Sequence, residues 1–304
     1  MKTFVFSAVA MGILASCTNS AIDDVVNNDE PVAIRLTAGV QVSASATRAA
    51  IDNNSTFTAS VFGWEVVKDA NPEYATATPW TSLTGDIKAS STGNESVSLL
   101  TKQHYQTNGD KTYIKAISPA EGNISNGSYT FATALTGKED VLLTKTAVAG
   151  SRSDATVALS FSHILTRFNF KVIKGEHFDS DVQVTKIKIN GANIAESINL
   201  ADNTITSKAV DDGIVISISG VTIGATELLA GDPVMIVPCL ANTLTLDIDT
   251  SKMKYSGVTV KPASGDNFVE GTSYTITLTF NDKEVGATAA VAEWSDGTGS
   301  GTVE

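Results

Sequence analysis

The clearest pattern in the chain is an alternation of apolar and polar or small residues near the N-terminus. It runs from residue 32 to residue 47 and stops at Arg48, ahead of the turn-forming sequence Asp52-Asn53-Asn54-Ser55. A period of two residues over this length predicts a strand with one buried face. The apolar positions are Val32, Ile34, Leu36, Ala38, Val40, Val42, Ala44 and Ala46.

Shorter apolar segments, separated by Gly, Asn and Pro, predict further strands along the whole chain. Their order, with no convincing long helix between them, favours β-sandwiches. In the segment 157–172 the apolar positions change register after Leu165, which predicts a bulge or kink. The predicted strands lie at 57–67, 111–117, 141–148, 157–172, 182–189, 214–218, 234–237, 244–248, 274–280 and 285–294.

The length of 304 residues is typical of two domains. The segment 149–154, Ala-Gly-Ser-Arg-Ser-Asp, is the best candidate for a polar hinge between them. We therefore expect one β-sandwich domain over 32–152 and a second over 153–304. The last residues, 295–304, have the Gly-rich and polar composition of a flexible tail.

The N-terminus has the features of an export signal. A positive start, Met1-Lys2, precedes an apolar segment at 3–16, which is shorter than the roughly 20 residues needed to span a bilayer. It ends in Leu-Ala-Ser-Cys, which resembles a bacterial lipobox. In that case residues 1–16 are removed, Cys17 carries the lipid, and the Asn- and Asp-rich segment 17–31 is a tether. The alternative is an ordinary signal peptide followed by an incidental cysteine.

Charge and cysteine content limit the partners and the covalent bonds that this chain can have. The net charge of −12, without a basic cluster, argues against nucleic acid as a partner. If Cys17 is lipidated, Cys239 alone remains, so no intrachain disulfide can form, and we expect Cys239 to be a buried apolar residue.

The sequence shows no catalytic or metal-binding pattern, and we predict neither an enzyme nor a cofactor. The three histidines, His104, His163 and His177, lack metal-ligand spacing. Because His163 is in phase with the apolar residues of its strand, we expect a hydrogen-bonded core residue rather than a ligand. The tryptophans are compatible with a sugar platform, but aromatic residues in strands are more often part of a core; they are Trp64, Trp80 and Trp294.

Several motifs, in this order and spacing, resemble the fimbrillin family, the subunits of type V pili of anaerobic Gram-negative bacteria. The N-terminal ones are the lipobox at Cys17 and an alternating strand that ends in Thr47-Arg48-Ala49. The others are Phe161-Ser162-His163-Ile164-Leu165, Phe168-Asn169-Phe170, the segment 271–278 (GTSYTITL) and Val291-Ala292-Glu293-Trp294.

The resemblance implies two transthyretin-like Greek-key β-sandwich domains in an outer-membrane lipoprotein at the cell surface. It further implies lipidation of Cys17, cleavage between Arg48 and Ala49 by an Arg-specific protease, and assembly with other pilus subunits by donor-strand exchange. Shaft, tip and anchor subunits share the pattern, so an adhesive role towards a host or bacterial surface ligand stays open. A tail this short after residue 294 is unusual for a donor strand.

Two alternatives are open at this point. Arg152, in the expected hinge, competes with Arg48 as a cleavage site, whereas we expect Arg35 and Arg167 to be poorly accessible within their strands. The competing function is a surface lipoprotein that binds glycans as an intact monomer and needs no cleavage.

Overall fold

All regular structure in the described part of the protein is β-strand, which confirms the all-β prediction. The computed structural model describes residues 30–40, 51, 55–67, 70–90, 95–179, 181–238, 242–262, 267–281 and 284–292. Residues Pro31–Glu304 form one compact unit, distinct from Met1–Glu30. Within the described ranges, no helix has the length and apolar character needed to cross a membrane.

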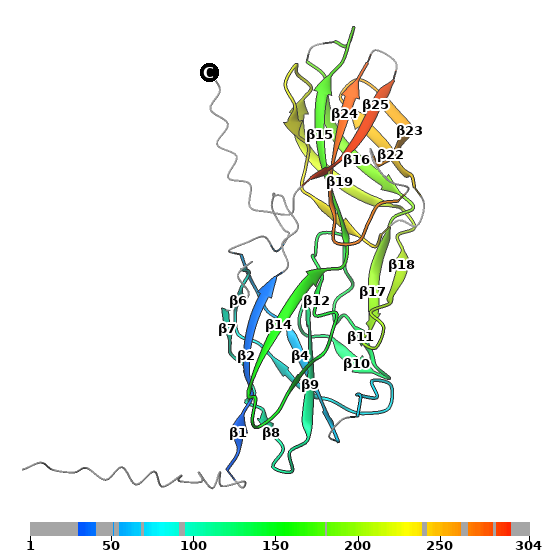
Figure 1. Ribbon diagram of the computed structural model, residues 1–304. Coiled ribbons are helices and arrows are strands. Elements are labelled where there is room, and N and C mark those ends of the chain that lie inside the picture. Colours follow the sequence, from blue (N-terminus) through cyan, green and yellow to red (C-terminus); the bar gives the residue numbers. More distant parts are fainter. Residues whose placement is uncertain are drawn as a thin grey trace, which may run out of the picture. The chain divides into compact units, whose positions relative to one another are not determined.

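A mixed sheet dominates the first half of this unit (Figure 1). Its strands run in the order β5-β4-β9-β12-β14-β2-β7, with β13 also paired to β9, while β1 pairs with β8 and β3 with β6. The bounds are β1 Val32–Ala33, β2 Arg35–Val40, β3 Thr56–Phe57, β4 Ser60–Val66, β5 Trp80–Leu83, β6 Ile87–Lys88, β7 Glu95–Val97, β8 His104–Tyr105, β9 Lys111–Ser118, β10 Asn123–Ser125, β11 Ser128–Thr130, β12 Leu142–Leu143, β13 Val148–Gly150 and β14 Thr156–His163.

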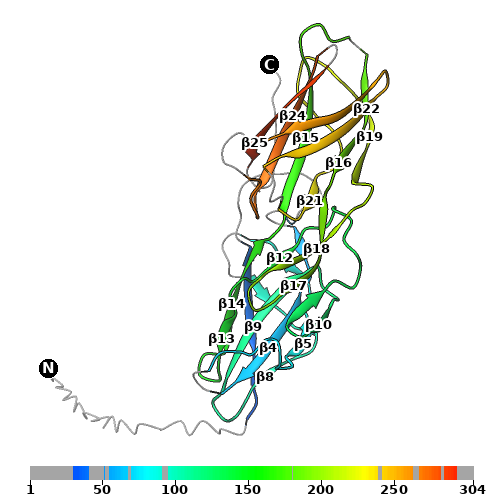
Figure 2. The ribbon, with the colours of Figure 1, turned by 90° about the vertical axis from the view of Figure 1, so that its right-hand side faces the viewer.

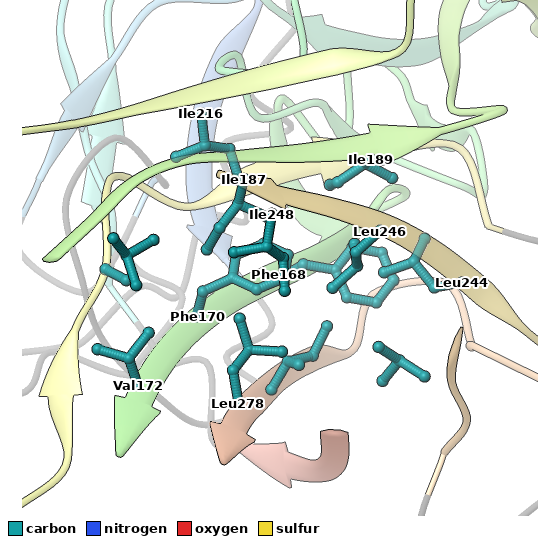
Figure 3. Packing of buried hydrophobic residues seen from close by; sticks show 14 of the residues in the cluster. Phe168, Phe170, Val172, Ile187, Ile189, Ile216, Leu244, Leu246, Ile248 and Leu278 are labelled. Atoms are coloured by element: carbon teal, nitrogen blue, oxygen red, sulfur yellow. The ribbon is translucent and has the colours of Figure 1, made fainter. Parts of the chain in front are cut away.

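Two sheets in the second half face each other across an apolar core (Figure 3). One has the order β20-β15-β24-β25, with β21 also paired to β15, and the other has the order β19-β16-β22-β23. The bounds are β15 Thr166–Lys174, β16 Gln183–Asn190, β17 Asn193–Asn199, β18 Ile205–Ala209, β19 Ile214–Thr222, β20 Leu228–Leu229, β21 Val234–Ile236, β22 Leu244–Thr250, β23 Lys254–Val260, β24 Ser273–Phe280 and β25 Val285–Ala292.

The side chains of this core alternate along their strands, as a sandwich requires. Phe168 and Phe170 of β15 point towards residues of β16 and β22 in Figure 3. The core residues labelled there, Phe168, Phe170, Val172, Ile187, Ile189, Ile216, Leu244, Leu246, Ile248 and Leu278, are all less than a tenth exposed.

A hairpin from the second half, β17–β18, joins the first half through a four-stranded sheet of order β10-β11-β17-β18 (Figure 2). Ile198 of β17 pairs with Tyr129 of β11, and both are fully buried. They share an apolar cluster with Phe62 and Ile117 of β4 and β9. The hairpin therefore contributes to the core of the sheet that precedes it in sequence.

The register change predicted in 157–172 has a larger cause than a bulge. The chain leaves one sheet at the end of β14, at His163, and enters another at the start of β15, at Thr166. Because the two sheets bury different faces of the chain, the apolar positions shift phase at this crossing.

The segment 149–154 connects β13 and β14, which lie in the same connected group of strands. Ser151 and Asp154 exchange two backbone hydrogen bonds of 3.1 Å there, so the segment forms a tight turn. The domain boundary expected at residue 152 thus does not coincide with a change of sheet, which falls between His163 and Thr166. The division into domains 32–152 and 153–304 stays a prediction.

Candidate assembly site

Strand β2 lies inside its sheet, between β14 and β7 (Figure 1). It runs parallel to β14, from the pair Arg35–Thr156 to the pair Val40–Phe161. On its other side it is antiparallel to β7, which pairs with three residues of β2. Strand β2 thus completes a sheet in which its parallel partner, β14, comes more than a hundred residues later in the chain.

The buried face predicted for β2 is confirmed over the described residues, and Gly39 on the opposite face is buried as well. Ile34, Leu36, Ala38 and Val40 are 8%, 2%, 0% and 4% exposed. Three large aliphatic side chains at about 1.5–3 kcal/mol each amount to roughly 5–9 kcal/mol of burial. That is comparable with the whole stability of a domain, about 5–15 kcal/mol.

These side chains belong to one apolar cluster of the first half, together with Phe57, Val61, Leu159 and Phe161. Phe57 and Phe161 meet edge to face, with ring centroids 5.2 Å apart. Removing β2 would uncover this cluster and the open edge of β14.

Backbone hydrogen bonds hold both ends of the strand. At its start, Ile34 N–H donates to Gln103 O and Arg35 N–H to Ala155 O, both at 2.9 Å. At its end, Val40 N–H donates to Ser90 O at 3.1 Å. Just ahead of β2, Val32 pairs with Tyr105, whose hydroxyl has a pKa raised to about 12, mainly by burial.

The predicted processing residues Arg48 and Ala49, and the end of the alternating segment from residue 41, lie outside the described residues. So do Cys17, Cys239 and Trp294.

Ile51, two residues after Ala49, is described, and its N–H donates to Asp140 Oδ2 at 3.1 Å. Its side chain packs against the same apolar cluster as β2.

Asp140 and His163 form a buried pair at this point. His163 Nδ1 lies 2.9 Å from Asp140 Oδ2, and both residues are 4% exposed. The expectation that His163 is a hydrogen-bonded core residue is confirmed. Its partner was not predicted, because Asp140 precedes β12 whereas His163 ends β14, and only the pairing of these strands brings the two together.

The other arginines differ in accessibility. Arg167 is fully buried, as predicted. The expectation for the Arg35 side chain is wrong, because it points from the outer face of β2 and is exposed. The Arg35 backbone is nevertheless held in the ladder with β14. Arg152 is half-buried in the tight turn between β13 and β14.

Two of the tryptophans considered for a sugar platform, Trp64 and Trp80, lie in the described residues, and both contribute to packing. Trp64 is 1% exposed, and Trp80 is half-buried against the cluster that contains β2. Neither forms part of an exposed platform. Over the described residues, no group of three or more His, Cys, Asp or Glu side chains is placed to hold a metal ion.

A buried lysine that the sequence analysis did not single out ties the two halves together. Lys115 of β9 is 1% exposed, and its Nζ donates to Leu200 O at 2.6 Å and to Asn203 Oδ1 at 2.7 Å. Burial lowers the Lys115 pKa to about 8, against a smaller opposing effect of Asp202. Its acceptors lie in the turn between β17 and β18. The sequence did contain a signal for this residue, namely a lysine inside the predicted strand KTYIKAI at 111–117.

Fold and site together define an all-β protein in which strand β2, from the start of the compact unit, fills an interior position of a sheet. The family model described as fimbrillin-like matches residues 47–294, and the chain belongs to this family. No match was found among curated proteins.

Solved structures of proteins from three Bacteroides species share the fold. A cell adhesion protein from Bacteroides uniformis aligns with a TM-score of 0.56 at 15% identity, covering 88% of this chain and 99% of its own. A fimbrial protein from Bacteroides vulgatus aligns with a TM-score of 0.56 at 15% identity, covering 87% and 99%. A cell adhesion protein from Bacteroides ovatus aligns with a TM-score of 0.50 at 14% identity, covering 87% and 98%.

Proposed function

We propose that this protein is a structural subunit, shaft or tip adhesin, of a type V cell-surface pilus. It is exported as an outer-membrane lipoprotein, cleaved after Arg48 by an Arg-specific protease and assembled with other pilus subunits by donor-strand exchange. Membership of the fimbrillin-like family supports the class. The observation that carries the mechanism is the interior position of β2, whose large side chains are buried between two neighbouring strands.

The physical argument follows from what β2 covers. Cleavage after residue 48 separates β1 and β2 from the rest of the chain. If they leave, Leu159 and Phe161 of β14 lose their cover and the β14 backbone loses a parallel partner. A donor strand from another subunit can restore both, which is addition of a strand to an open sheet position. The uncut chain is then a stable monomer, and the cut chain is competent for assembly.

Lipid attachment at Cys17 is a separate part of the proposal. It gives the subunit a route to the outer membrane without a spanning segment, since acyl chains provide the anchor. Cells that express the full chain should incorporate labelled palmitate into it, and a Cys17→Ser variant should not. Equal labelling of the variant would contradict this part alone.

Cleavage can be tested on the full chain carrying Cys17→Ser. An Arg-specific protease should produce a new N-terminus at Ala49, found by N-terminal sequencing. Arg48→Lys should abolish that cut, whereas the matched variant Arg152→Lys should leave it unchanged. A dominant cut after Arg35, Arg152 or Arg167 would contradict the proposal.

Assembly is tested by size-exclusion chromatography of the clipped protein with other fimbrillin-like subunits of the same cell. The clipped protein should enter larger species, and the uncut Arg48→Lys variant should stay monomeric. If instead the uncut chain alone is retained on a polysaccharide gel and the clipped chain never assembles, the glycan-binding alternative gains support. The burial of Trp64 and the packing of half-buried Trp80 against the apolar cluster speak against that alternative.

A further inference from the structure

Strand β19 forms one edge of the sheet β19-β16-β22-β23, and its outer side has no strand partner among the described residues. The segment 214–217 pairs continuously with β16 before a bulge interrupts the ladder. Its sequence, IVIS, contains no charged residue and no proline. Proteins protect exposed strand edges with charges, prolines or bulges, so this flat and uncharged edge is a place where another strand can pair.

A groove of about 320 Å³ runs along this edge and is lined by all four residues of 214–217. Successive side chains of a strand point to opposite faces, so four consecutive residues border one groove when it follows the backbone edge. Ile214 and Ile216 are 7% and 5% exposed, whereas their partners on β16, Ile189 and Ile187, are 0% exposed. The core is therefore less well covered on the side of the groove.

The wall opposite β19 includes two segments that approach it through glycine. A methyl group at Gly137 would lie 2.8 Å from Ile214 Cδ1, and one at Gly231 would lie 2.3 Å from Ile216 Cγ2. The φ angles of these glycines, 88° and 79°, lie in the region that glycine adopts without strain. One segment is thus fixed beside Ile214 and the other beside Ile216.

A charged residue follows each of these glycines, and both charged residues line the groove. They are Lys138 and Asp232, and both are exposed. Neither forms an ion pair within the described part of the chain. On β16, by contrast, Lys186 Nζ lies 2.6 Å from Asp249 Oδ2. A cation therefore marks one end of the groove and an anion marks the other, and each is available to a ligand.

We propose that this groove is a second strand-addition site, which binds an extended segment of another polypeptide antiparallel to β19. The segment carries a basic, an aliphatic and an acidic residue at alternate positions, so that all three side chains point into the groove. The base meets Asp232, the aliphatic side chain packs on Ile214 and Ile216, and the acid meets Lys138. Backbone hydrogen bonds to β19 provide affinity, and the three side chains select the sequence.

The antiparallel direction follows from the order of the charges. Asp232 lies next to the glycine that approaches Ile216, and Lys138 lies next to the one that approaches Ile214. A segment that enters with its basic residue first therefore runs from Ile216 towards Ile214, against the direction of β19. The site lies in the other half from β2 and requires no cleavage, so it goes beyond the proposed donor-strand exchange.

Peptide binding to the full chain carrying Cys17→Ser and Arg48→Lys tests the proposal. The probe is the mixed heptapeptide Thr-Lys-Thr-Val-Thr-Glu-Thr with an N-terminal fluorophore, and fluorescence anisotropy reports binding. The all-acidic and all-basic peptides, with Glu or Lys at both charged positions, are compared with it at about 0.15 M salt, which screens distant charges. The mixed peptide should bind at least about fivefold more tightly than either. Failure of the mixed peptide to bind saturably would overturn the proposal.

Charge reversal in the groove should change the order of the three peptides. Asp232→Lys should favour the all-acidic peptide, and Lys138→Glu the all-basic one, each by at least about fivefold over the mixed peptide. Glu284→Lys and Lys254→Glu change the net charge equally at exposed positions outside the groove and should keep the original order. A loss of stability cannot mimic a change of order. An unchanged order in both groove variants would overturn the proposal.

Methylated peptides test whether the ligand binds as a strand. Alternate amides of an extended peptide face the same edge, so N-methyl groups at positions 3 and 5 block one edge, and those at positions 2, 4 and 6 block the other. One of these mixed peptides should bind like the parent, and the other at least about tenfold more weakly, because its hydrogen bonds to β19 are lost. Equal affinities of the two would overturn strand addition.

A second copy of this chain is the alternative occupant. Sedimentation velocity should show the uncut chain as a monomer. A dimer that dissociates when the mixed peptide is added would overturn the assignment to another polypeptide. A failure of the proposed function is distinguishable, since absence of the cut after Arg48 or of larger species contradicts that function, whereas peptide binding is measured on the uncut chain.

Discussion

At the scale of single residues, buried polar groups mark where distant segments of this chain are held together. Asp140 binds the backbone that follows the proposed cut, and Lys115 binds the turn of a hairpin from the other half. Such groups are costly unless they are paired, so their partners show which contacts the fold must keep.

The Lys115 ammonium makes stability depend on pH. Its pKa is about 8 in the folded chain and near 10.5 when unfolded, so between these values the unfolded chain binds more protons. Stability contributed by this group therefore rises as pH increases through that window. We expect wild type to gain stability over Lys115→Met between these two pH values, measured as urea midpoints.

The exposed Lys254 supplies the control for this experiment, since Lys254→Met should track wild type at both pH values. A gap between wild type and Lys115→Met that does not change with pH would contradict the prediction.

At the scale of elements, β2 shows how much of a strand is encoded locally. Its alternation predicted the buried face through Ile34, Leu36, Ala38 and Val40, because a period of two places these side chains on one side whatever the partner. The prediction for Arg35 was wrong because membership of a strand protects the backbone, whereas the outward side chain stays accessible.

Short strands were the elements most often missed. The strands that were not predicted are β5, β6, β7, β8, β10, β11, β17, β18, β20 and β23, and six of these ten have no more than three residues. Their pairing depends on neighbours supplied by the fold rather than on their own apolar pattern.

Leu36→Ala should destabilise the uncut chain by about 2–5 kcal/mol, because it leaves a cavity in a core that is otherwise filled. Once the chain is clipped and the 31–48 segment has been released, the same substitution should have no effect on the remaining protein. The measurement is urea unfolding of both forms, with Ala33→Ser on the exposed face of the same segment as the control. An equal loss in the clipped and uncut forms would show that the segment stays bound after cleavage.

At the scale of the whole described unit, the hairpin β17–β18 couples the two halves. It follows β16 of the second half, yet pairs with β11 and packs on β4 and β9. Because residues of this hairpin share an apolar cluster with β4 and β9, we expect that neither half opens without disturbing the other.

Ile198→Ala should therefore lower amide-exchange protection in β9 as well as in β17, by about 2–5 kcal/mol, since the fully buried Ile198 side chain shares an apolar cluster with Ile117 of β9. The exposed Ser207 of β18 offers a matched control, Ser207→Ala. Protection lost in β17 but retained in β9 would show that the halves unfold independently.

The sequence by itself determined the all-β class, the buried face of β2, the core position of His163 and the family. These follow from local periodicity and from motifs, which need no knowledge of partners. Tertiary structure alone decided that β2 is an interior strand, that the phase shift after Leu165 is a crossing between sheets, and that Asp140 lies beside Ile51. Each of these depends on pairing between segments far apart in the chain, and a residue pattern within one strand carries no record of which strand will lie next to it.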